Sequence, residues 1–152
     1  MAIVAQTHPL VIGVDTHARN HALTVLAAAT GEVVAADQFP ATSAGMARAV
    51  AWAARRTGAD LATLWVIEGV ATYGARLART APGAGYQVVE AARMNARAHH
   101  AVGKSYPLDA HHIAAAVLPL DVDELRRPRR AVVAAGAARV PRCGSWSQPV
   151  TT

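Results

Sequence analysis

The sequence contains one cysteine, one lysine and one phenylalanine among its 152 residues. Because a disulfide and a cysteine-based zinc site both need more than one cysteine, Cys143 alone excludes an internal disulfide and a zinc site of that type. Since Lys104 is the only lysine, arginine supplies nearly all of the positive charge. Aromatic residues make up 5% of the chain and alanine supplies much of its 53% hydrophobic content, so we expect one modest core.

Long apolar segments are also missing. None approaches the roughly 20 residues that a membrane-spanning helix requires, and the N-terminus lacks the basic start and apolar centre of a signal peptide. We therefore expect a soluble, cytoplasmic protein with no membrane partner. The length suits a single domain, and the composition excludes a disordered acidic chain and a fibrous repeat.

Acidic residues are few, with 10 Asp and Glu against 15 Lys and Arg, for a net charge of +5. The excess is concentrated in residues 121–152, which carry 6 basic and 3 acidic groups. This balance permits binding to nucleic acid without establishing it, since a GC-rich coding sequence also produces arginine and alanine in excess.

Short apolar segments bounded by turn residues predict five strands, and three other segments have helical periodicity. We expect the strands at 11–15, 22–28, 33–39, 64–67 and 86–89, and the helices between 42 and 58, at 71–79 and at 107–118. The first three strands follow one another with short turns, which predicts an antiparallel meander, and each later strand follows a helix. This order predicts an α/β ribonuclease H-like (RuvC-like) fold: a mixed sheet with three meandering strands followed by helix–strand crossover units.

The same pattern divides the chain into three segments. Residues 1–10 have no clear periodicity, and we expect them to be disordered, whereas residues 11–120 form the α/β domain. Residues 121–152 are basic and lose the regular pattern around the arginine-rich stretch at 126–130, so we expect an irregular tail. The candidate functional residues should therefore lie within 11–120.

Three acidic residues lie where a sheet of this kind collects ligands. Asp15 ends the first strand, Glu68 ends the fourth, and Asp109 lies at the start of the last helix. Alone, Asp15 suits a turn and Asp109 suits a helix N-terminus. Together, in this fold order, the three predict converging carboxylates that hold divalent metal for phosphodiester chemistry, with Mg²⁺ or Mn²⁺ as ions that prefer oxygen ligands.

Three motifs contain these carboxylates: VIGVDTH around Asp15, VIEGVATYG around Glu68 and GKSYPLDA around Asp109. In this order they resemble the N-terminal domain of the IS110-family insertion-sequence transposases, which are RuvC-like DEDD recombinases. The resemblance runs from about residue 11 to about residue 130. It implies DNA transposition, with Asp15, Glu68 and Asp109 as catalytic metal ligands, Mg²⁺ or Mn²⁺ as cofactor, and DNA and a structured guide RNA as partners.

The chain departs from this family at two places. The last two carboxylates of the family lie in a Lys-Ser/Thr-Asp-x-x-Asp-Ala motif, and Tyr106 occupies the first of these positions. Because a neutral phenol is a poor magnesium ligand, we expect weakened metal binding and an inactive site. The family also has a C-terminal domain with a serine nucleophile, so we expect a truncated chain whose tail, from between about 131 and 143, is a frameshift product.

Basic residues before the last motif are candidates for weak contacts with nucleic acid. Arg93, Arg97 and Lys104 can neutralise phosphates of DNA or RNA, although a solvated helix face explains them equally well. His17 is a candidate for contact with the metal or the phosphate because it lies two residues after Asp15.

Other histidines and the tryptophans have simpler explanations. The adjacent histidines at 99–100 and 111–112 diverge on a helix, so we expect them to face solvent rather than to bind zinc as a pair. Trp52 and Trp65 are expected in the core rather than as stacking platforms for bases.

Two other functions stay open beside transposition. One is a remnant without catalysis that binds nucleic acid, or that forms a homo-oligomer or pairs with full-length transposase and inhibits it. The other is an ATPase of the sugar-kinase and actin class, which shares the ribonuclease H-like fold. Those proteins usually have a glycine two residues after the first aspartate, to admit a phosphate, and His17 at that position disfavours the ATPase.

Overall fold

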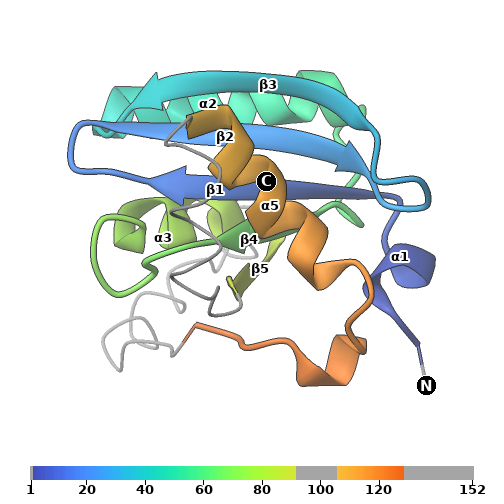
Figure 1. The fold of residues 1–152 in the computed structure, drawn as a ribbon. Helices are drawn as coiled ribbons and strands as arrows, with labels where there is room; N and C mark the ends of the chain where they lie inside the picture. Colours follow the sequence, from blue (N-terminus) through green and yellow to red (C-terminus); the bar gives the residue numbers. More distant parts are fainter. Residues whose placement is uncertain (1, 92–105, 129–152) are drawn as a thin grey trace, which may run out of the picture.

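The protein has three layers, with a five-stranded sheet between helices (Figure 1). The structure is a computed structural model that describes residues 2–91 and 106–128, with side chains from 109 onward in the second range. Helices α2 (Ser43–Thr57) and α3 (Ala75–Gly83) cover one face of the sheet, and α5 (Tyr106–Val117) crosses the other. This arrangement confirms the predicted α/β ribonuclease H-like fold.

The sheet has the strand order β3-β2-β1-β4-β5 and is mixed. Its strands are β1 (Leu10–Thr16), β2 (Asn20–Ala27), β3 (Val33–Pro40), β4 (Leu64–Ile67) and β5 (Gln87–Glu90). The first three pair antiparallel, whereas β1 with β4 and β4 with β5 pair parallel. The predicted meander and crossovers are therefore present, and β1 lies at the junction between the two kinds of pairing.

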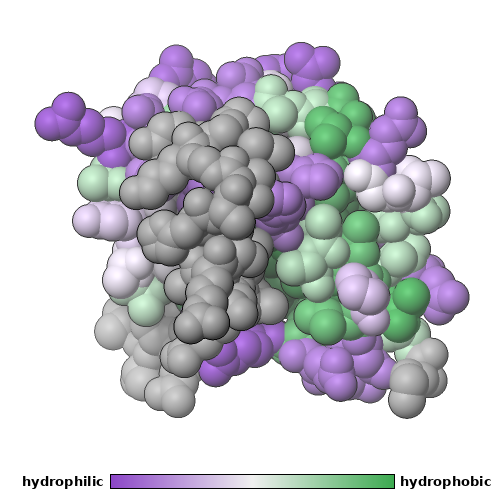
Figure 2. All heavy atoms as spheres, in the orientation of Figure 1, coloured by the Kyte–Doolittle hydropathy of each residue, from purple (hydrophilic) through white to green (hydrophobic). Residues whose placement is uncertain are grey.

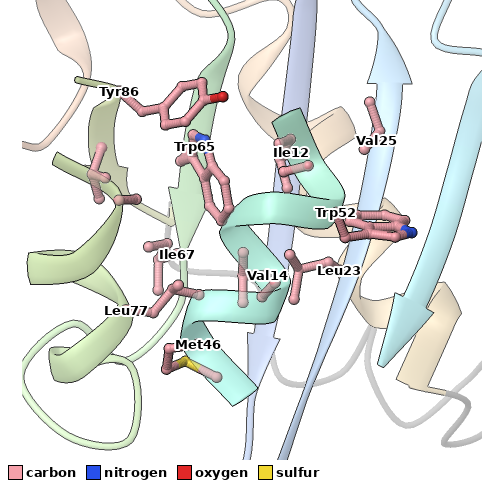
Figure 3. Packing of buried hydrophobic residues seen from close by; sticks show 14 residues of the cluster. Ile12, Val14, Leu23, Val25, Met46, Trp52, Trp65, Ile67, Leu77 and Tyr86 are labelled. Carbon is pink, nitrogen blue, oxygen red and sulfur yellow. The ribbon is translucent and has the colours of Figure 1, made fainter. Parts of the chain in front are cut away.

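Helix α2 carries one apolar stripe and well-formed ends. The Thr42 hydroxyl accepts a hydrogen bond from the Gly45 N–H at 2.9 Å, which caps the N-terminus, and Gly58 at φ 66° ends the helix in the left-handed conformation. The buried stripe packs with α3 on a core that contains both predicted tryptophans, Trp52 and Trp65 (Figure 3). The core on this face is rich in large side chains, among them Ile12, Leu23, Met46, Ile67, Leu77 and Tyr86.

Helix α5 packs on the opposite face through small residues. A Cβ atom on Gly13 of β1 would lie only 2.1 Å from the carbonyl oxygen of Ala110 and 2.9 Å from the Cβ of Ala114. Glycine at position 13 therefore lets the α5 backbone approach β1 directly. Ile113 and Val117 complete the apolar contact with the sheet.

The two ends of the described domain differ from the sequence prediction. Residues 1–10 were expected to be disordered, but Val4–Thr7 form the short helix α1, and Val4 is fully buried against the α5 face. Its backbone N–H donates to the Leu120 carbonyl oxygen at 2.9 Å. Periodicity could not reveal this segment because it is anchored by a partner that lies far away in the chain.

The tail that was expected to be irregular from residue 121 is partly ordered. Val122–Glu124 form the 3₁₀-helix η1, and isolated bridges join Asp121 to Ile3 and Arg126 to Glu90. Residues 129–152, where the frameshift was expected, lie outside the described residues. Helix α3 also begins later than predicted and contains Pro82 in its last turn rather than ending before it.

Side-chain character varies over the surface seen in Figure 2. Hydrophilic residues gather along the upper edge of that view, over β3 and α2, and apolar residues gather toward the right-hand half. On the edge strand β3, Val33 and Val34 are each about half exposed. Within the described residues, no helix combines the length and the hydrophobicity that a membrane span requires.

Candidate functional site

Asp15 and Glu68 meet at the carboxyl ends of the parallel strands β1 and β4. Val14 pairs with Ile67, and the Glu68 N–H donates to the Val14 carbonyl oxygen at 3.1 Å, so the residues that follow are neighbours. Because side chains alternate along a strand and Ile67 belongs to the α2–α3 core, Asp15 and Glu68 both project on the α5 face. The predicted convergence of these two carboxylates is present in the structure.

Asp109 lies near the same site, on helix α5. It lies in the first turn of the helix, next to Ala110, which contacts Gly13 two residues before Asp15. Its negative charge is one of the causes that raise the pKa of Glu68, so the two carboxylates interact. The close approach at Gly13 therefore determines how near the third predicted carboxylate comes to the first two.

Burial and the neighbouring acidic groups oppose the ionisation of Glu68. Partial burial of its carboxyl group, a hydrogen bond that protonated Glu68 donates to Asp15, and the charge of Asp15 raise the pKa of Glu68 to about 7. The residue as a whole remains exposed although its carboxyl group is partly buried, and the pKa follows the carboxyl group. Two carboxylates that share a proton in this way form a favourable position for a cation.

His17 contacts the site, as its spacing from Asp15 suggested. Its Nε2 lies 2.9 Å from Oδ2 of Asp15, with the His17 side chain 42% exposed and the Asp15 side chain 6% exposed. The imidazole therefore covers the solvent side of an almost buried carboxylate. A histidine hydrogen-bonded to a carboxylate ligand is a common way to orient that ligand.

His21 is a further residue of this region, and its burial was not predicted from the sequence. It is fully buried on β2, and its Nδ1 accepts a hydrogen bond from the His17 backbone N–H at 3.3 Å. Desolvation lowers its pKa, so the imidazole is held in its neutral form. Its alternation with Leu23 and Val25 along β2 was the available signal.

The loop after β4 holds Glu68 from the backbone side. The Thr16 hydroxyl donates to the Glu68 carbonyl oxygen at 2.9 Å, and the Gly74 N–H donates to the Gly69 carbonyl oxygen at 2.8 Å. A Cβ on Gly74 would lie 2.6 Å from the Glu68 carbonyl oxygen, so glycine is required there. Tyr73, beside it, is 60% exposed on this loop.

The donor chemistry of the pair fits a divalent cation of the hard, oxygen-preferring kind. Asp15 is nearly buried and in contact with Glu68, and both offer carboxylate oxygens. Among the described residues, however, no three His, Cys, Asp or Glu side chains lie close enough together to surround one ion. The structure thus brings two of the predicted ligands into contact and places Asp109 within electrostatic reach of them.

The remaining predicted site residues fall outside this description. Arg93, Arg97 and Lys104 lie in the segment 92–105, beyond the described residues. Tyr106 begins helix α5, and only its backbone is described.

A comparison with protein families decides the assignment. A family model described as a transposase, the DEDD domain of the IS110 transposases, matches residues 12–135. The chain belongs to the IS110 family of DEDD transposases. Among curated proteins, none matches this chain. The match covers most of the chain and spans all three carboxylate motifs, so the resemblance inferred from those motifs is confirmed.

Membership in the IS110 family assigns the chain to DNA transposition, the movement of insertion sequences. The substrate of such a transposase is DNA, and DEDD transposases generally act with divalent metal ions. The sugar-kinase and actin alternative is thereby excluded.

Proposed function

We propose that this IS110-family domain acts on DNA phosphodiesters with a divalent metal, Mg²⁺ or Mn²⁺, held by Asp15, Glu68 and Asp109. The observation that carries the proposal is the contact between Asp15 and Glu68 at the ends of two parallel strands, with the Asp109 charge acting on the same carboxyl group. Two of these carboxylates are neighbours at the strand ends, and the charge of the third acts on them from helix α5. A purely structural role would not require this arrangement.

Each residue then has a defined task. Asp15 and Glu68 bind the ion through carboxylate oxygens, and Glu68 must lose its proton to do so. His17 holds the orientation of Asp15 through the 2.9 Å contact. When bound, the metal would polarise the phosphodiester and stabilise the charge that develops on its oxygens.

Tyr106 weakens this site in our proposal. It replaces one of four expected carboxylates, and a phenol near neutral pH contributes neither the charge nor the affinity of an aspartate. The backbone of residue 106 lies at the start of α5, one helical turn before Asp109. We therefore propose weak metal binding and a slow or inactive site in this chain.

The Tyr106→Asp variant tests this proposal. Mn²⁺ affinity is measured by calorimetry, and cleavage is followed on a labelled DNA carrying transposon ends. We expect Tyr106→Asp to bind Mn²⁺ about 5- to 150-fold more tightly than the native chain, since an added charged ligand contributes on the order of 1–3 kcal/mol. Asp15→Asn in the same background should remove the gain in Mn²⁺ affinity and any gain in cleavage. Equal affinity and equal cleavage in the native chain and Tyr106→Asp would contradict the proposal.

Tyr106 also supports a second candidate function. Without its fourth carboxylate, the domain would bind nucleic acid but not cut it, and it would inhibit full-length transposase by pairing with it or by occupying its DNA. Arg93, Arg97 and Lys104 would then contact DNA or a structured guide RNA through phosphates. A gel-shift with DNA and guide RNA, together with size-exclusion chromatography, separates the two functions. Binding without metal-dependent cleavage, even in Tyr106→Asp, favours the second.

A further inference from the structure

A pocket lies directly beside the carboxylate pair, at the turn between β1 and β2. It has a volume of about 320 Å³, and the described residues that line it are His17, Ala18, Arg19, Asn20, Ala22 and Gln38. Asp15 pairs with Ala22 and Ala22 pairs with Gln38, so these three side chains form one row across β1, β2 and β3 on the α5 face. The pocket therefore continues from Asp15 toward the β3 edge of the sheet.

The turn that forms one wall of the pocket is held in place from both sides. The His17 N–H donates to the Asn20 carbonyl oxygen at 3.1 Å, which closes the turn. The Ala41 N–H donates to the Arg19 carbonyl oxygen at 2.7 Å, which ties the turn to the end of β3. Both hydrogen bonds join backbone atoms, and the side chains of Arg19 and Asn20 are exposed beside them.

The lining has the chemistry of an anion and nucleotide site. Arg19 supplies a guanidinium, Asn20 and Gln38 supply amides, and none of the lining residues that the structure describes is a carboxylate. Arginine pairs with phosphate oxygens through two parallel hydrogen bonds, and amides hydrogen-bond to sugar and base edges. Ala18 and Ala22 contribute only methyl groups, which leaves the space open. The charge of this pocket is therefore opposite to that of the acidic site next to it, and the row that begins at Asp15 connects the two.

We propose that this pocket binds one nucleotide of the DNA strand, next to the phosphodiester held at Asp15 and Glu68. Arg19 contacts a phosphate, and Asn20 and Gln38 contact the sugar or the base. His17 lies between the two sites, since it lines the pocket and also contacts Asp15. The proposal rests on the proposed function, because it takes DNA as the substrate, and it adds the direction in which the strand leaves the carboxylates.

Binding of a fluorescein-labelled single-stranded DNA of about ten nucleotides, followed by anisotropy in EDTA, tests the pocket without metal or cleavage. Arg19→Ala should weaken binding by about 5- to 20-fold and reduce the slope of log K against log salt by about 0.7, as loss of one phosphate contact predicts. Ala18→Leu changes no charge and fills the pocket from an exposed turn position. It should weaken binding by about 3- to 10-fold with an unchanged slope.

Arg48→Ala is the matched control, since it removes the same charge from an exposed position on α2, which covers the other face of the sheet. We expect its affinity to change less than about twofold. Circular dichroism melting verifies that all three variants fold. The pocket assignment is overturned if Arg19→Ala weakens binding no more than Arg48→Ala does, or if Ala18→Leu binds as tightly as the native chain.

Two further outcomes test the nucleotide pocket separately from the choice of DNA as the ligand and from the metal site. An RNA of the same sequence that binds more than about tenfold tighter, with the same sensitivity to Arg19→Ala, overturns the assignment to DNA. Failure of Tyr106→Asp to gain metal binding, with the pocket variants behaving as expected, refutes the metal chemistry and leaves the nucleotide pocket intact.

Discussion

The two faces of the sheet are packed in different ways. The face under α2 and α3 contains large aromatic side chains, including Trp52 and Trp65, whereas the face under α5 has, among the described residues, only aliphatic side chains in its buried cluster, together with the close approach at Gly13. Large side chains hold a helix away from a sheet, and small ones let its backbone approach. The charged groups of the candidate site lie on the close-packed α5 face, so side-chain size on each face determines where chemistry can occur.

The largest expected effect on stability comes from the face of the sheet under α2 and α3. Trp65→Ala should lower the free energy of unfolding by about 4 kcal/mol, because it leaves a large cavity beside Tyr86. Trp65→Phe is the matched control, and it should cost only about 1.5 kcal/mol, since the indole Nε1 has no hydrogen-bond partner among the described residues. Urea denaturation measures both. A similar loss in the two variants would show that cavity volume is not the cause.

The next largest effect should come from the close approach on the other face. Gly13→Ala places a methyl group against the Ala110 carbonyl oxygen, so we expect a loss of about 3 kcal/mol in unfolding free energy and weaker Mn²⁺ binding as α5 moves outward. Gly83→Ala adds the same methyl group where no atom lies within 4 Å, and it should change stability by less than about 1 kcal/mol. Unchanged Mn²⁺ affinity in Gly13→Ala would show that the position of Asp109 does not affect metal binding.

A smaller effect should follow from the cap of α2. Thr42→Ala removes the acceptor of the Gly45 N–H, and we expect a loss of about 1 kcal/mol in unfolding free energy. Because α2 lies on the face away from the carboxylates, Mn²⁺ affinity should stay the same. Thermal and urea unfolding measure the first effect and calorimetry the second. Weaker metal binding in this variant would show that the two faces are coupled.

The smallest effect on stability should be a pH dependence that comes from Glu68, because solvent screens the charge of this exposed residue. Its pKa is about 7 in the folded chain against an ordinary value of 4.5, so the folded state binds more protons between these values. Without metal, this group stabilises the fold fully below about pH 4.5, and that stability is lost as the pH rises to about 7. Glu68→Gln should flatten this part of the pH profile. An unchanged profile in Glu68→Gln would assign the slope to other groups.

Metal binding should show the opposite dependence on pH at the same group. Mn²⁺ must displace the proton of Glu68, so the affinity should increase between pH 6 and pH 8, with proton release that differs between buffers. Calorimetry in two buffers of different ionisation enthalpy measures this release.

The order of strands and helices could be predicted from the sequence because it depends on local periodicity. Apolar segments such as 64–67, bounded by turn residues, indicate strands whatever lies elsewhere in the chain. The carboxylates could be predicted as well, since Asp15 and Glu68 stand at strand ends, where the fold order brings them together. Both inferences required only the sequence pattern and the topology that it implies.

Features that depend on distant partners could not be predicted in this way. Helix α1 is held by Leu118 and Leu120, and the burial of His21 depends on the strands and helices around it. The pocket beside Asp15 is formed by the register of three strands, which the sequence leaves undetermined. The contact of Gly13 with Ala110 likewise joins two elements that periodicity treats separately.

The central position of β1 has a consequence for folding. The hairpin contacts between β1, β2 and β3 join residues near in sequence and require little loop closure, whereas the contacts of β1 with β4 and α5 join residues far apart. We therefore expect Asp15 to reach its position before its two acidic neighbours, and the three carboxylates to come near one another only when the last helix has docked. A cation that needs all three would bind the native chain and no earlier intermediate, so occupancy by metal would report completion of folding.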